Sequence, residues 1–167
     1  MNEEYGEILK SVLSADPDII VFLEVKSGFY HYGHDKLSQS YPHHYVDLER
    51  GVAQGKALYS KYPILSAKSK SLGPQIGSLL EAKIDFKGAK LNIYGVHTVS
   101  PQSSKRIALR NSEFKAMAAL IEGVNQGAEP VVIAGDFNST PWHPSMQEFK
   151  RQSRLNNNHF YNIIPTW

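Results

Sequence analysis

The chain has 167 residues, 41% of them hydrophobic and 20% charged, as expected for one soluble globular domain. Its formal net charge of +2 is too small to indicate a nucleic-acid-binding surface, although it does not exclude one. The absence of cysteine excludes disulfides, thiolate zinc sites and a cysteine nucleophile, so any metal must bind oxygen or imidazole ligands. The longest apolar run, "IIVFL", is far shorter than the roughly 20 residues of a membrane span, and the sequence indicates no compartment.

Hydrophobic patterns in the first half of the chain predict one helix and three strands. Apolar residues at helical spacing predict an amphipathic helix over residues 5–13, which ends at an Asp-Pro pair. Residues 18–25, "DIIVFLEV", predict a buried strand. Residues 27–44 are rich in His, Tyr and Gly without a clear period, so we expect a loop there. Residues 44–50 and 55–65 predict two antiparallel strands.

The second half predicts a hairpin, a long helix and a last strand. Residues 79–99 contain two alternating runs separated by a Lys-Gly turn, which is typical of a hairpin. Ser104 can cap a long helix that ends near Gly127. Residues 130–138 begin with a continuous apolar run that predicts a strand buried on both faces, followed by one short helix at most. We therefore expect one α+β domain over residues 1–167, with mostly antiparallel pairing.

The apolar stripe of the long helix contains one charged residue. The stripe consists of Ile107, Arg110, Phe114, Met117, Ile121 and Val124. A charge on such a face usually has a partner or extends its end to solvent. We expect Arg110 to form a structural ion pair, with a role facing a substrate as the alternative.

Two apolar strands each meet a carboxylate at their C-terminal end. "IIVFL" is followed by Glu24, and "VVIAG" is followed by Asp136. If these strands are neighbours, the two acids lie at one rim of the sheet, where oxygen ligands could hold Mg²⁺ with several waters left in its shell. The alternative is that each acid only ends a strand or caps a helix, and Glu24 taken alone favours this structural interpretation. Asn138, two residues after Asp136, favours a functional site over that structural interpretation.

His97 ends a third predicted strand, in which alternate residues share one face. Its imidazole could reach the same rim and donate a hydrogen bond to a phosphate oxygen. The alternative is a partly buried histidine whose ring is satisfied by the backbone. His43 and His44 are adjacent on a strand and point to opposite faces, so we interpret them as surface residues.

Four segments, taken in order, resemble the endonuclease/exonuclease/phosphatase family related to deoxyribonuclease I. They are "PDIIVFLEV", "GKALYSKYPI", "YGVHT" and "VVIAGDFNSTPW", and the resemblance extends over residues 16–144. The later stretch "NSTPWHPSM" is similar to bacterial-type members of that family. The resemblance implies a two-layer β-sandwich flanked by helices, and hydrolysis of phosphate esters that depends on a divalent cation.

The resemblance also implies a role for each candidate residue. Glu24 corresponds to the glutamate that binds the metal, which is Mg²⁺ or, in its place, Mn²⁺. His97 corresponds to the histidine that contacts the scissile phosphate. Asp136 would orient or activate the attacking water, and Asn138 would help hold the phosphate group and its leaving side. These residue types suit an anionic substrate, whose charge must be offset while a carboxylate positions water.

The sequence also departs from the family pattern at both ends. The family begins with a strand that carries an asparagine near the metal, and it ends with an aspartate-bearing strand and an Asp-His pair. No segment before the first predicted helix can form that first strand, and no aspartate follows Asn138. We therefore expect a fragment that lacks both terminal strands, is weakly active or inactive alone, and self-associates through exposed sheet edges.

Two classes of function remain open at this stage. The first is a divalent-metal-dependent phosphoesterase in the intact parent protein, a nuclease among the alternatives. The second is a catalytically inactive domain on the same fold that binds phosphate or a partner. The expected partner is a phosphate-ester substrate, with nucleic acid and phospholipid head groups both compatible with the residues.

Overall fold

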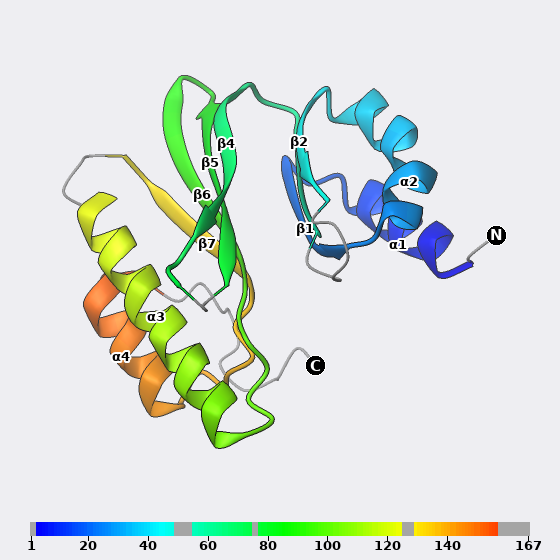
Figure 1. The fold of residues 1–167 in the computed structure, drawn as a ribbon. Coiled ribbons are helices and arrows are strands. Elements are labelled where there is room, and N and C mark those ends of the chain that lie inside the picture. Colours follow the sequence, from blue (N-terminus) through cyan, green and yellow to red (C-terminus); the bar gives the residue numbers. More distant parts are fainter. Residues whose placement is uncertain (1–2, 49–54, 75–76, 125–128, 157–167) are drawn as a thin grey trace. The chain divides into compact units, whose positions relative to one another are not determined.

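The computed structural model describes residues 3–48, 55–74, 77–124 and 129–156. Over these residues the chain forms four helices and seven strands, which are labelled in Figure 1. In chain order they are α1 (Glu3–Ala15), β1 (Ile19–Val25), α2 (Ser27–Ser40), β2 (His43–Asp47), β3 (Gly55–Ser60), β4 (Ile64–Ser71), β5 (Ser78–Phe86), β6 (Ala89–His97), α3 (Ser104–Val124), β7 (Val131–Asp136) and α4 (Pro144–Ser153). None of the described helices is both long and apolar enough to cross a bilayer.

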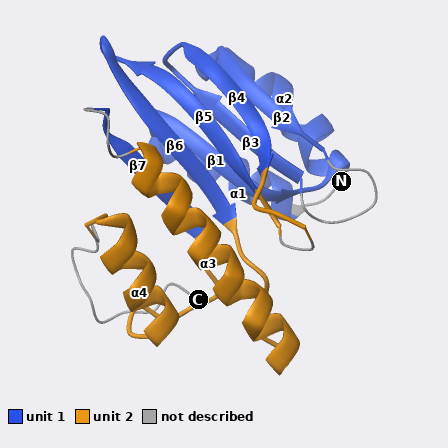
Figure 2. Ribbon diagram, turned by 60° about the vertical axis from the view of Figure 1, so that its left-hand side comes forward, with its two compact units in different colours: residues 1–70, 79–96, 129–135 blue, residues 71–78, 97–128, 136–167 orange. Residues whose placement is uncertain are grey.

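The chain forms two compact units, which Figure 2 colours blue and orange. The first unit consists of Met1–Lys70, Leu79–Val96 and Glu129–Gly135. It holds α1, α2 and nearly all of the strands. The second unit consists of Ser71–Ser78, His97–Ala128 and Asp136–Trp167, and it holds α3 and α4.

The first unit is a sandwich of two sheets. One sheet has the strand order β1-β3-β2, with antiparallel pairing throughout, and the other has the order β4-β5-β6-β7. A core of five buried residues joins the sheets: Leu58, Leu80, Ala82, Ile84 and Ile93. Three of these alternate along β5, so the period of two that predicted the strand also predicts its buried face. The expected two-layer sandwich is confirmed.

A second core lies between the β1-β3-β2 sheet and the helices α1 and α2. It includes Leu9, Ile20, Phe29, Leu37 and Tyr59. Leu37 and Tyr59 are almost fully enclosed, and burying a large apolar side chain stabilises a fold by roughly 1.5–3 kcal/mol. The two helices therefore close one face of this sheet.

Helix α2 contradicts the loop expected over residues 27–44. Its buried positions are Phe29, Gly33 and Leu37, which follow one another at a helical spacing of four. A Cβ added at Gly33 would lie 3.1 Å from Leu9 Cδ2, so the missing side chain lets α1 approach closely. The buried stripe thus has a glycine at its centre, and an apolar pattern could not reveal it.

The predicted hairpin is confirmed. β5 and β6 pair antiparallel down to Phe86 and Ala89, with Lys87 and Gly88 between them at φ 55° and 88°. Positive φ at both turn residues matches the right-handed twist of the strands. The strand expected over residues 55–65 is instead two strands, because β3 ends before Pro63 and β4 begins after it.

The structure corrects two expectations for the second half of the chain, the cap of the long helix and the burial of the last strand. The Oγ of Ser103, rather than Ser104, accepts a hydrogen bond from Arg106 N at 3.3 Å and so caps α3. The expected end near Gly127 lies outside the described residues, and α3 is described to Val124. β7 is not buried on both faces, because Val132 is 46% exposed while the alternate positions are half-buried.

The second unit has its own small core. Phe114 on α3, Phe137 after β7 and Phe149 on α4 lie with ring centroids 5.8–6.3 Å apart. Such tilted ring packing stabilises aromatic clusters beyond the area that they bury. The cluster fixes α3 and α4 against the turn that follows β7.

Candidate functional site

His97 and Asp136 end two neighbouring strands, β6 and β7, and both belong to the second unit. Thr98 N donates a hydrogen bond to Asp136 O at 3.0 Å, and Asn92 N donates one to Pro130 O at 2.9 Å. Both bonds have the same sequence offset, so the two strands run parallel. The carboxyl ends of parallel strands meet at one edge of a sheet, which is where ligands bind in many α/β folds.

The turn after β7 is tied to the end of β6. Asn138 N donates to Asp136 Oδ1 at 2.8 Å, and Asn138 Nδ2 donates to Thr98 O at 2.7 Å. Thr98 Oγ1 in turn donates to Phe137 O at 2.6 Å. Asn138 sits at φ 44°, a left-handed conformation that Asn tolerates better than most residues. These bonds hold the turn in place while Asp136 stays exposed.

Gly135, just before this turn, is required by the close approach of β6. Its φ is 142°, and an added Cβ would lie too close to Val96 O for any side chain to fit. The Gly in "AGDFN" is therefore a steric necessity of the strand end.

Two charged residues on α3 are almost fully buried: Arg110 is 3% exposed and Glu113 is 1% exposed. Glu113 Oε2 accepts from Val99 N at 2.8 Å, and Glu113 Oε1 accepts from Gly77 N at 3.1 Å. A carboxylate with two backbone N–H donors can remain buried. The sequence pattern missed Glu113, although a second charge on the apolar face of α3 was a signal that could have revealed it.

Arg110 does not form the ion pair expected from the sequence. Its NH1 donates to Asn138 O at 2.7 Å, and its NH2 lies 3.2 Å from His143 Nε2. No carboxylate among the described residues pairs with it. Burial lowers the pKa of its guanidinium, since desolvation disfavours the charged form. Arg110 instead contacts the turn that follows β7.

Glu24 belongs to the first unit, whereas His97, Asp136 and Asn138 belong to the second. It is exposed, at φ 56°, where the β1–β3 register shifts between Leu23 and Val25. Such a bulge redirects a side chain and often lies next to active sites. That Glu24 meets Asp136 at one rim stays a prediction. Within the described residues, no group of three or more His, Asp or Glu could hold a metal ion.

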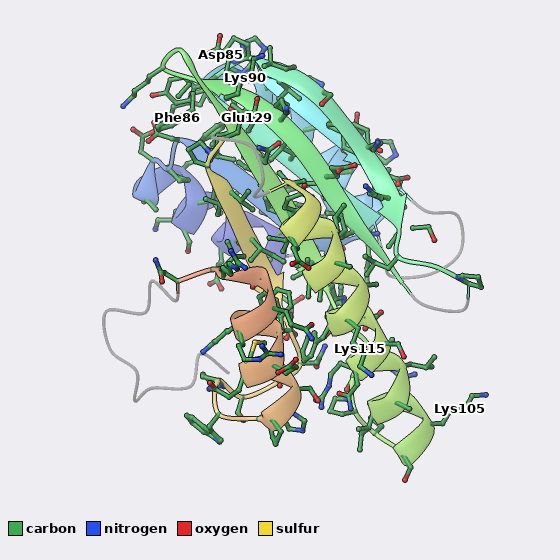
Figure 3. All side chains as sticks on the ribbon, turned by 90° about the vertical axis from the view of Figure 1, so that its left-hand side faces the viewer. Asp85, Phe86, Lys90, Lys105, Lys115 and Glu129 are labelled. Carbon is green, nitrogen blue, oxygen red and sulfur yellow. The ribbon has the colours of Figure 1, made fainter. Side chains whose placement is uncertain are left out.

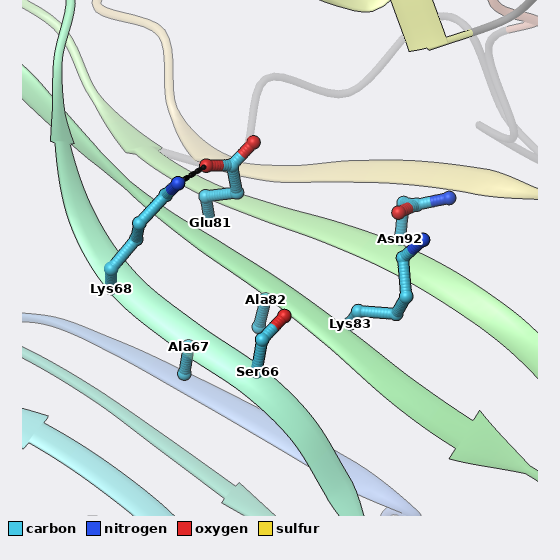
Figure 4. Close-up of a pocket in the computed structure, with 7 residues that line it drawn as sticks. All are labelled: Ser66, Ala67, Lys68, Glu81, Ala82, Lys83 and Asn92. Carbon is cyan, nitrogen blue, oxygen red and sulfur yellow. Dashed lines mark ion pairs between the residues drawn. The ribbon is translucent and has the colours of Figure 1, made fainter.

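A shallow pocket of about 200 Å³ lies elsewhere, on the second sheet of the first unit (Figure 4). It is lined by Ser66, Ala67, Lys68, Glu81, Ala82, Lys83 and Asn92. Its charged side chains are all paired: Lys68 Nζ lies 3.1 Å from Glu81 Oε2 within the pocket, and Lys83 Nζ lies 2.7 Å from Oε2 of Glu129, which does not line it. The pocket includes none of the predicted site residues.

An α+β sandwich with a Gly-Asp-Phe-Asn turn at a strand end is the architecture of deoxyribonuclease I-like proteins. The model of the endonuclease/exonuclease/phosphatase family matches residues 2–167, so the chain belongs to this family of phosphoesterases and nucleases. No curated protein matched the chain in sequence.

Solved structures share the fold. Sphingomyelinase C from Streptomyces griseocarneus matches with a TM-score of 0.78 and 17% identity, over 93% of this chain and 63% of that one. A beta toxin variant from Staphylococcus aureus with bound magnesium ions has a TM-score of 0.74 and 20% identity, over 93% and 63%. The human nocturnin catalytic domain with bound sulfate has a TM-score of 0.73 and 18% identity, over 92% and 63%. The chain thus spans less than two thirds of these relatives.

Proposed function

We propose that this chain carries residues of a divalent-metal-dependent phosphoesterase site, with Asp136 orienting the attacking water. The observation that supports this most is the state of the Asp136 carboxylate. It is exposed, one oxygen accepts from Asn138 N, and no donor among the described residues bonds the other oxygen. A carboxylate held by one oxygen has the other available to accept a hydrogen bond from water.

Asn138 and His97 would contact the phosphate. One N–H of the Asn138 amide is used by Thr98 O, which leaves a second N–H and the amide oxygen. His97 ends β6 at the edge where Asp136 ends β7. In the reaction, the water passes a proton to Asp136 as its oxygen bonds to phosphorus, and the bond to the leaving oxygen breaks as that oxygen takes a proton from solvent. N–H donors offset the charge on the phosphate oxygens.

Glu24 would provide a protein ligand for Mg²⁺, with Mn²⁺ as a substitute. An exposed carboxylate fits this role, because Mg²⁺ is usually held by one or two carboxylates together with waters and substrate phosphate. The bound metal would offset negative charge on the phosphate and the leaving oxygen. A relative with bound magnesium and another with bound sulfate support this proposal.

The proposed substrate is a phosphate ester, with a nucleic acid or a phospholipid head group as the two candidates. The family description includes endonucleases and a sphingomyelinase shares the fold, so the fold itself does not favour either candidate.

The test compares the chain with its Asp136→Ala variant on bis(p-nitrophenyl) phosphate, with Mg²⁺ and with EDTA. We expect Asp136→Ala to lower the Mg²⁺-dependent rate by roughly 100-fold or more, the contribution typical of a positioned base. Glu122→Gln, which removes an exposed carboxylate from α3, should leave the rate unchanged. Equal rates in the chain and in Asp136→Ala would contradict the assignment. Mg²⁺-dependent binding of phosphate without any hydrolysis would favour the inactive binding domain.

A further inference from the structure

The guanidinium of Arg110 joins two points of one short loop. It donates to Asn138 O at the start of the loop, and its NH2 lies 3.2 Å from His143 Nε2 at the loop's end. Between them, His143 N donates to Thr140 O at 3.1 Å, and Gln147 Nε2 donates to Pro141 O. All of these residues belong to the second unit. The loop that begins with the Asp136 turn is therefore closed by a single buried side chain.

Fold stability does not explain why an arginine occupies this position. The side chain is enclosed, its Nε has no hydrogen-bond partner, and no carboxylate among the described residues compensates its charge. Replacing a complete set of buried charges with apolar side chains of similar volume is often neutral or stabilising, and replacing Arg110 strands no paired carboxylate among the described residues. The neighbouring Phe114 ring, 5.8 Å from the Arg110 Cζ, would accept such a replacement. What arginine adds is a fixed position for the loop.

Glu113 has the complementary role on the same face of α3. Its carboxylate holds Val99 N, in the segment that follows His97 and β6, while Arg110 holds the segment that follows Asp136 and β7. One helix therefore ties down the chain at both strand ends that carry candidate catalytic residues.

We propose that Arg110 is a positioning residue, which holds the loop of residues 138–143 so that Asp136 and Asn138 keep a fixed geometry. The catalytic part of this proposal rests on the proposed function, but the fixed loop does not. Asn138 at φ 44° needs support from its surroundings, and the bond from Arg110 NH1 to its carbonyl is one such support. The guanidinium itself touches no reacting group in this proposal.

Trp142 provides a readout that is independent of activity. It is 61% exposed, lies between Asn138 and His143, and is one of only two tryptophans in the chain. A Trp167→Phe background leaves it as the single emitter. Time-resolved fluorescence anisotropy of Trp142 then reports local loop motion.

The experiment introduces Arg110→Met and Arg110→Lys into that background. Lys115→Met is the control, because it removes a lysine that projects outward from α3 (Figure 3). In Arg110→Met we expect an unchanged or raised Tm, a larger fast component of the Trp142 anisotropy decay, and a kcat lowered by about 100-fold with little change in KM. Arg110→Lys can form one of the two bonds and should restore the anisotropy and kcat in part. Lys115→Met should match the background in all three measurements.

Two outcomes would overturn the proposal. One is unchanged anisotropy in Arg110→Met at any Tm, which together with a lowered Tm is the result expected for a purely structural arginine. The other is full kcat in Arg110→Met. If the background protein hydrolyses no phosphodiester, the proposed function fails, and the anisotropy of the two variants alone decides whether Arg110 fixes the loop.

Discussion

Two of the four candidate site residues, Glu24 and Asn138, have a strained backbone with positive φ. Within the described part of the chain, five non-glycine residues have positive φ: Asp16, Glu24, Lys87, Asn138 and Arg154. Three have local reasons, since Asp16 follows α1, Lys87 forms the hairpin turn and Arg154 caps the C-terminus of α4. Glu24 and Asn138 instead lie at strand bulges or strand ends and carry predicted roles. Left-handed conformations persist where the surroundings enforce them, and they cluster at functional sites.

The strain at Asn138 predicts an order of stability for two substitutions. Asn138→Ala and Asn138→Gly both remove the hydrogen bond to Thr98 O, but only Gly adopts positive φ without a steric penalty. We expect Asn138→Ala to unfold more readily than Asn138→Gly, by about 1 kcal/mol in the free energy of unfolding. Urea denaturation measures this difference. A variant pair at Ser139 is the control, and an alanine variant as stable as the glycine variant would exclude strain at Asn138.

At the scale of elements, α2 and the β2–β3 pair form a cluster of aromatic rings. His34 Nδ1 lies 3.0 Å from the Tyr59 hydroxyl, and the His34 and His44 ring centroids are 4.6 Å apart. Burial raises the pKa of Tyr59 to about 12. Burial lowers the pKa of His44, and the nearby His34 and His43 lower it further, while a backbone hydrogen bond at Pro42 acts in the opposite direction. The cluster therefore favours a neutral His44.

This lowered pKa predicts that acid destabilises the first unit. Below a pH of roughly 6.5, the unfolded chain binds a proton at His44 more readily than the folded chain does. Stability due to this residue is therefore present at neutral pH and is lost as the pH falls through that range. We expect the urea midpoint to fall between pH 7.5 and 5.5, and to fall less in His44→Phe. His31→Phe, on the exposed face of α2, should keep the full dependence, and equal dependence in both variants would contradict the prediction.

Helix α4 shows a competition between two contacts of one ring. Ser145 N lies 3.2 Å from His143 Nδ1, as in an N-cap, while Arg110 contacts Nε2. A neutral imidazole has one N–H, so it cannot accept at both nitrogens, and a guanidinium can only donate. With the proton on Nε2, Nδ1 accepts from Ser145 N and caps α4; with the proton on Nδ1, Nε2 accepts from Arg110 NH2 instead. The end of the loop and the start of α4 thus compete for His143.

At the scale of the whole molecule, the strands at the edges of the sheets are the feature that bears on self-association. β7 is a terminal strand in its sheet order, and Val132 on it is 46% exposed. An edge strand with apolar residues is a template for pairing with another chain. We propose that the chain self-associates through β7, as the sequence led us to expect.

The test is a dilution series of the chain followed by light scattering. Val132→Lys should lower the mass at high concentration, because a lysine on an edge strand opposes pairing. Ile8→Lys is a matched control, since Ile8 on α1 is 43% exposed but lies on no strand. A monomeric chain at every concentration, or an equal effect of both variants, would contradict edge pairing.

Local patterns in the sequence predicted much of the secondary structure of this protein, and also its family. The alternating runs of β5 and β6 and the helical spacing in α1 and α3 predicted an α+β domain. The motif segments that include "GDFN" carried the family resemblance, and that resemblance implied the sandwich. These signals are local, because side-chain periodicity follows directly from backbone geometry. Only the tertiary structure decided the rest. Gly33 is a helix contact because Leu9 fills the space beside it, and Val132 is exposed because one face of β7 is open among the described residues. Arg110 donates a hydrogen bond to the carbonyl of Asn138, 28 residues away. Every residue has a backbone carbonyl, so the sequence could not indicate which one Arg110 would bind. Only the folded structure shows what holds the loop after Asp136.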